Sequence, residues 1–98
     1  MIISKKNDGD VLTVIPEGRL DSTTSGEFAE FLDANFTQEI KKLVVDFGKV
    51  DFISSKGLRV IVSTYKNLGE RTMEITSANA AVMEVFRLSG LLKVIEVK

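Results

Sequence analysis

The stretch Leu43-Val44-Val45-Asp46-Phe47 decides the fold class. A short and nearly continuous apolar run of this kind is typical of a central strand that is buried on both faces of a sheet. Only Asp46 interrupts the run, and we expect its carboxylate to lie at the strand end or to accept hydrogen bonds. The sequence on either side must therefore supply the rest of a sheet and the helices that cover it.

Upstream of this strand, the pattern predicts a hairpin and one helix. Residues 2–5 and 11–15 read as two antiparallel strands joined by turn formers at 7–10, and Pro16 suits a strand edge or bulge. A helix is expected to run to about residue 37, because its apolar residues recur at helical spacing. Thr24 and Glu27 fit a capping box at its start. The apolar positions are Phe28, Phe31, Leu32 and Phe36.

Downstream, two more helices alternate with two more strands. One helix follows residue 54 and ends before Gly69, and a strand is expected at 72–76. Asn79 is a candidate cap for the next helix, which Gly90 closes with Leu91 in hydrophobic contact beyond it. A last strand is expected at 94–97. The order β-β-α-β-α-β-α-β predicts a single α/β domain over residues 1–98, with helices packed on a mixed sheet.

Composition excludes several classes of function. The chain of 98 residues contains no cysteine and no histidine, so thiolate chemistry, a Ser-His-Asp triad and most transition-metal sites are not available. A net charge of −1 gives no basic surface for nucleic acid. No apolar run approaches the roughly 20 residues that span a bilayer, and the N-terminus does not resemble a signal peptide. We therefore expect a cytoplasmic protein with no cofactor and no membrane insertion.

The most informative segment is Phe52-Ile53-Ser54-Ser55-Lys56-Gly57-Leu58-Arg59, which lies between the central strand and the second helix. Loops at the carboxyl ends of strands often carry function in α/β sheets. The plainest interpretation is that one serine caps the helix and the other is solvated. Anion binding at the helix start is a second interpretation. A serine nucleophile is disfavoured because only Lys56 could act as its base.

Four segments together resemble the STAS domains of bacterial anti-sigma factor antagonists. The loop just quoted resembles the family signature, and the resemblance extends over essentially the whole chain. The other three segments are Gly18-Arg19-Leu20-Asp21, Leu43-Val44-Val45-Asp46-Phe47, and Leu88-Ser89-Gly90-Leu91 followed by Val94-Ile95.

The resemblance implies a phosphorylation switch at Ser55, which lies two residues before the loop glycine. In the family, the unphosphorylated protein binds an anti-sigma factor that is also a serine kinase, and a PP2C-type phosphatase reverses the modification. Ser54 and Lys56 depart from the best-known members, which have Asp before the phosphorylated serine and often Ser or Thr after it. This leaves Ser54 as a second candidate acceptor.

The resemblance also implies a partner-binding surface formed by the loops at both helix starts. An alternative for the first of these residues is a capping carboxylate. The implied partner-binding residues are Asp21, Ser22, Thr23, Ser54, Lys56, Gly57 and Arg59.

Other functions compete with the switch. The domain could be a STAS adaptor subunit of a membrane lipid-transport complex, in which Ser55 need not be modified. An enzyme is disfavoured by the missing histidine and cysteine, and nucleotide binding has only Gly57 in its support.

Overall fold

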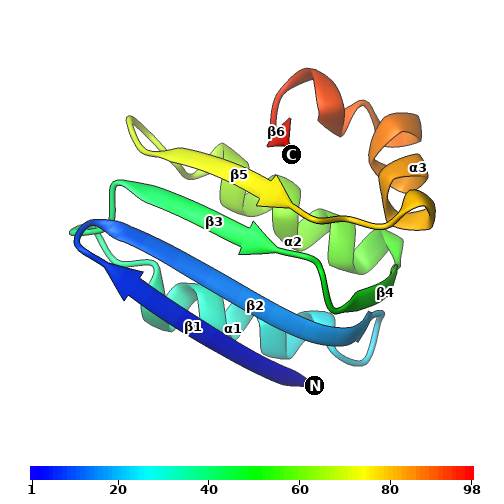
Figure 1. Ribbon diagram of the computed structural model, residues 1–98, viewed down its shortest axis with the longest axis horizontal. Coiled ribbons are helices and arrows are strands. Elements are labelled where there is room, and N and C mark those ends of the chain that lie inside the picture. The colour runs from blue at the N-terminus through cyan, green and yellow to red at the C-terminus, as the bar shows by residue number, and fades with distance from the viewer.

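The chain begins with a hairpin that forms one edge of a mixed six-stranded sheet (Figure 1). In the computed structural model, which describes residues 1–98, β1 (Ile2–Asp8) pairs antiparallel with β2 (Val11–Leu20). The sheet continues through β3 (Lys42–Asp46), β5 (Thr72–Thr76) and β6 (Glu96–Val97), all parallel. The predicted hairpin, central strand and mixed α/β class are confirmed.

The second strand is twice as long as expected, and it serves two parallel partners in turn. Its residues 11–14 pair with β3, and its residues 18–20 pair with a further strand, β4 (Val50–Ile53). Pro16 is buried and lies between these two ladders, so its missing N–H falls where neither parallel partner is paired. The register shifts between Gly18 and Arg19. The strand boundary predicted at residue 15 was therefore wrong.

Strand β4 was not anticipated, and it adds one element to the predicted order. The chain leaves β3 through a tight turn in which Asp46 Oδ1 accepts the N–H of Gly48 at 2.8 Å. This contact confirms the expected role of the Asp46 carboxylate. Only Val50 and Ile53 of the four β4 residues are buried, so the strand shows no period-2 pattern. That absence explains why the sequence read as a loop.

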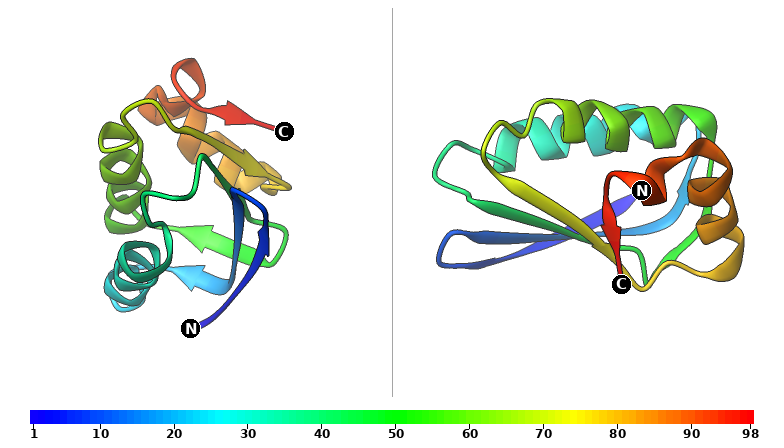
Figure 2. Two further views of the ribbon diagram at one scale, coloured as in Figure 1. Left: turned by 90° about the vertical axis from the view of Figure 1, so that its left-hand side faces the viewer. Right: turned by 90° about the horizontal axis from the view of Figure 1, so that it is seen from above.

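Helices α1 (Ser25–Asn35) and α2 (Ser55–Lys66) lie side by side on one face of the sheet, and α3 (Ala80–Ser89) packs against the end that carries β4 (Figure 2). Nineteen buried apolar residues form one core between these layers. None of the helices combines the length and the hydropathy that a bilayer crossing would require.

Two predicted helix ends agree with the structure, whereas the predicted cap of α1 and the predicted last strand do not. Asn79 accepts the N–H of Val82 at 2.8 Å, and Gly90 takes the left-handed conformation that ends α3, as predicted. The capping box was wrong, because Thr24 makes no side-chain cap contact. The last strand is shorter than expected, since a 3₁₀ turn at Leu91–Lys93 occupies the preceding residues.

The sheet face opposite α1 and α2 carries a buried carboxylate. Alternation along β5 directs Met73 and Ile75 to the core and Glu74 to the other face. Lys42 and Lys98 reach Glu74 at 3.3 and 3.1 Å. Burial alone would raise the pKa of Glu74, but the hydrogen bonds from the two ammonium groups outweigh it and hold the pKa below its ordinary value.

Candidate functional site

Two loops meet where β2 and β4 end side by side. The carbonyl oxygen of Leu20 accepts the backbone N–H of Ser54 at 2.8 Å, directly after the last ladder pair, Leu20 with Ile53. The loop that begins at Asp21 therefore lies beside the start of α2. The structure brings together the two groups of partner-binding residues that the sequence analysis proposed.

One of the two adjacent serines caps α2 and the other is solvated, as the plainest interpretation of the sequence expects. Ser54 is half-buried and caps α2, because its hydroxyl accepts the N–H of Gly57 at 3.2 Å. Ser55 is the first helical residue, is exposed, and makes no hydrogen bond through its side chain. Of these two serines, only Ser55 has a hydroxyl that is exposed and makes no hydrogen bond.

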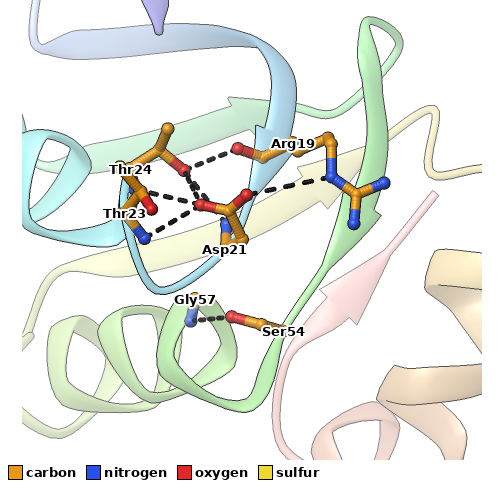
Figure 3. A network of polar contacts seen from close by, with 6 residues as sticks. All are labelled: Arg19, Asp21, Thr23, Thr24, Ser54 and Gly57. Carbon is orange, nitrogen blue, oxygen red and sulfur yellow. Dashed lines mark hydrogen bonds and ion pairs between the residues drawn. The ribbon is translucent and has the colours of Figure 1, made fainter.

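Asp21 organises the neighbouring loop (Figure 3). Its Oδ1 accepts the backbone N–H groups of Thr23 at 2.9 Å and Thr24 at 3.2 Å. These hydrogen bonds, the one from Thr23 foremost, hold the pKa of Asp21 below its ordinary value. Asp21 therefore orders the turn before α1, and the helix-capping role that was one of its two interpretations is not seen, because Thr24 is the cap residue and α1 has no side-chain cap. The Thr24 hydroxyl donates to the carbonyl oxygen of Arg19 and accepts the backbone N–H of Asp21.

The side chain of Arg19 in β2 contacts Phe52 in the neighbouring strand β4. Its guanidinium lies 4.3 Å from the centre of the Phe52 ring, and its Nε lies 3.8 Å from Asp21 Oδ2. Phe52 is 38% exposed, so a cation–π contact on the surface covers one side of the ring. Sequence analysis missed this pair, because the signal depends on the register between β2 and an unpredicted strand.

An apolar groove opens beside Ser55. It has a volume of about 590 Å³ and lies between β4, the first turn of α2, and α3. Leu88 in this groove is 72% exposed, the largest exposed fraction among the large apolar side chains of the chain. We name the four exposed or half-buried apolar residues of this groove the docking patch: Phe52, Leu58, Val85 and Leu88.

The remaining candidate residues lie around this patch or behind it. Ser22 and Thr23 are exposed in the first loop, whereas Gly57 is buried in the first turn of α2. Lys56 and Arg59 are exposed and line a second, more polar groove of about 350 Å³ between α1 and α2. Ser55 therefore borders an apolar surface on one side and a pair of cations on the other.

The site offers few groups for covalent chemistry. No cluster of three carboxylates lies anywhere in the chain with the spacing needed to hold a metal ion. The ionisable side chains of the two loops are Arg19, Asp21, Lys56 and Arg59, and Asp21 already accepts two backbone N–H groups. The arrangement presents an accessible hydroxyl next to an apolar surface.

Comparison with known proteins identifies relatives of this chain. The sequence model of the STAS domain matches residues 2–98. The anti-sigma-B factor antagonist of Listeria monocytogenes is 28% identical over 96 residues, which cover 96% of this chain and 84% of that protein. BtrV of Bordetella bronchiseptica, described as an anti-sigma factor antagonist, is 31% identical over 94 residues, covering 94% of this chain and 80% of BtrV.

The solved structures agree with this relationship. The crystal structure of an anti-sigma factor antagonist from Mycobacterium paratuberculosis superimposes with a TM-score of 0.91 at 25% sequence identity. The match covers 98% of this chain and 83% of that one. Both the mixed sheet and the helix arrangement are therefore shared with proteins of this class.

Proposed function

This chain belongs to the STAS domain family, and we propose from that premise that it is an anti-sigma factor antagonist switched by phosphorylation of Ser55. In the unmodified state it binds an anti-sigma factor that is also a serine kinase, and so releases the kinase's target. The modified state does not bind, and a PP2C-type phosphatase restores it. The protein is then the substrate of both enzymes and the catalyst of neither, and it acts in the cytoplasm where ATP is available to the kinase.

The single observation that carries this proposal is the free hydroxyl of Ser55 next to the docking patch. A kinase needs a hydroxyl that it can reach, and Ser55 is exposed at the first turn of α2. A regulated interface needs apolar surface close to the modified group, and Phe52 and Leu88 supply it within the same groove. Ser54 is a poorer acceptor, because its hydroxyl caps the helix.

The physical effect of the phosphate supports a switch of binding over a switch of folding. A phosphoryl group adds about −1.5 to −2 charges, and a helix N-terminus favours such charge by about 0.3–1 kcal/mol. The domain should therefore tolerate the modification. A partner that packs on the docking patch would have to desolvate the phosphate, and the cost exceeds what a contact at the rim of an interface contributes.

The lipid-transport adaptor is not favoured, because the relatives identified above carry antagonist names. It makes a different prediction, since an adaptor does not need a phosphate acceptor at Ser55. The two functions are therefore separated by one modification assay.

The assay incubates the purified chain with ATP and each serine kinase encoded near its gene, followed by phosphopeptide mapping by mass spectrometry. We expect one phosphate on Ser55, no incorporation into Ser55→Ala, and normal incorporation into Ser54→Ala once its folding has been verified. Absence of phosphate on Ser55 with every such kinase would contradict the proposal. Phosphate on Ser54 in the wild-type chain would move the switch by one residue.

A further inference from the structure

Arg59 lies one helical turn after Ser55, and its guanidinium is unoccupied. It is exposed, and no ion pair of the structure includes it. We propose that Arg59 receives the phosphate when Ser55 is modified, so that phosphorylation also withdraws this cation from the partner surface. The inference rests on the proposed function and adds to it a residue that shapes the modified state.

The helix geometry directs Arg59 toward Ser55. Residues four apart on a helix are neighbours, and helical side chains lean toward the N-terminus. A side chain as long as that of Arg59 can therefore reach back over the first turn of α2, where Ser55 begins the helix. The order is also the favourable one, with the anion N-terminal to the cation. A guanidinium can grip a phosphate with two parallel hydrogen bonds.

The first turn of α2 offers additional donors to a phosphate at this position. Ser54 accepts two N–H groups, that of Gly57 through its hydroxyl and that of Leu58 through its carbonyl oxygen. The N–H groups of Ser55 and Lys56 have no acceptor in the structure. These backbone donors would attract a phosphate with or without Arg59, so the proposal depends on the guanidinium and is tested through it.

The other cations near Ser55 are less suited to this role. Arg19 is held over the Phe52 ring at 4.3 Å and lies 3.8 Å from Asp21. Lys56 follows Ser55 directly, and adjacent residues on a helix do not face each other. Lys56 and Arg59 share the groove between α1 and α2, but only Arg59 also lies on the Ser55 side of the helix, since four residues span little more than one turn.

The consequence is a switch with two simultaneous changes. In the unmodified chain, Arg59 is free to contact an acidic group on the partner. In the modified chain, the phosphate both adds negative charge beside the docking patch and engages the guanidinium. A partner that relies on Arg59 therefore loses a contact in addition to meeting an unfavourable charge.

The test uses the full chain with phosphoserine placed at position 55 during synthesis, so that no kinase is required. The second ionisation of the phosphate is followed by ³¹P NMR as a function of pH. A nearby cation favours the dianion and lowers this pKa, so Arg59→Gln should raise it by about 0.3 units. Lys56→Gln and Lys66→Gln each remove one cation from the same helix and serve as matched controls.

A rise confined to Arg59→Gln supports the proposal. No rise in Arg59→Gln, or an equal rise in either lysine variant, overturns it, because the phosphate would then sense only the general charge of the helix. Circular dichroism of each variant verifies that α2 is intact. Failure here leaves the kinase assay unaffected, whereas failure of the kinase assay leaves this pairing measurable, so the two proposals fail separately.

Discussion

Gly57 packs directly against the carbonyl oxygen of Leu20: a Cβ atom placed on Gly57 would lie 2.8 Å from that oxygen. The same atom would lie 3.0 Å from Cγ1 of Ile53. The absence of a side chain at Gly57 is thus what lets the first turn of α2 approach the end of β2. This approach places the Ser55 and Asp21 loops next to each other.

Substituting Gly57 should lower the free energy of unfolding by disturbing the contact between α2 and β2. The Cβ atom added in Gly57→Ala would collide with a backbone oxygen and with a buried side chain, and overpacking of this kind costs about 1–3 kcal/mol. Gly26→Ala is the matched control, because nothing lies within 4 Å of its added Cβ. That variant should be neutral or more stable by up to about 1 kcal/mol, owing to better helix propensity. Urea unfolding of both variants measures the difference, and equal stabilities would contradict the close-packing argument.

The two adjacent serines should respond differently to alanine. Ser54→Ala removes the hydroxyl that accepts the Gly57 N–H, and loss of such a cap costs about 1 kcal/mol. Ser55→Ala removes an exposed hydroxyl without a partner and should change stability by less than about 0.5 kcal/mol. Thermal unfolding compares the two variants with the wild type. If Ser55→Ala were the more destabilising of the two, the assignment of cap and acceptor would be reversed.

Charge at Ser55 should control binding. With the kinase identified by the modification assay and ATP present, Ser55→Ala is expected to remain bound, whereas Ser55→Asp binds at least about tenfold more weakly, a difference of 1.4 kcal/mol. Size-exclusion chromatography or calorimetry measures both complexes. Since neither variant should unfold, equal affinities would show that negative charge at this position does not determine binding.

The docking patch should contribute to affinity without contributing to stability. Leu88 is 72% exposed, so Leu88→Ala removes little buried area from the free protein. An apolar anchor in an interface is worth more than about 1 kcal/mol, which corresponds to at least a fivefold loss of affinity for the kinase. Ile2→Ala is the control, because Ile2 is 66% exposed and lies outside the groove. Loss of affinity in both variants to the same extent would argue against a specific patch.

Glu74 should make the stability of the fold decrease at acidic pH. Its pKa is lower in the folded chain than its ordinary value of 4.5, so its ion pairs stabilise the fold above that pH. The contribution is lost as pH falls from about 4.5 through the lower folded pKa. Urea unfolding at a series of pH values should show a shallower decline over this range for Glu74→Gln than for wild type. Identical slopes would indicate that Lys42 and Lys98 do not hold the ionised form.

The sequence was sufficient for the parts of the fold that have strong periodicity or a local signal. The run 43–47 predicted a central strand, Asn79 and Gly90 predicted both ends of a helix, and the Ser54–Ser55 pair predicted one cap and one free hydroxyl. Each of these depends on residues within a few positions of one another, which is why the pattern alone reveals it.

Most of the features that were missed depend on pairing between distant segments. Strand β4 forms because Leu20 is available beside Ile53, and nothing within Val50–Ile53 indicates that partner. Thr24 has the right residue type for a capping box, but the Arg19 carbonyl oxygen competes for its hydroxyl across a bend in the chain. The Arg19–Phe52 contact and the docking patch require the same unpredicted register.

Asn79, described above as a helix cap, has a second consequence for the behaviour of the free protein. Its Nδ2 donates to the carbonyl oxygens of Val50 at 3.2 Å and Asp51 at 3.4 Å, on the outer edge of β4. An unpaired strand edge can recruit a strand from another molecule and so begin aggregation. Here one amide side chain covers that edge, and the exposed carboxylate of Asp51 adds a charge to it. Strand β4, which lies beside Ser55, is in this way protected against edge-to-edge self-association.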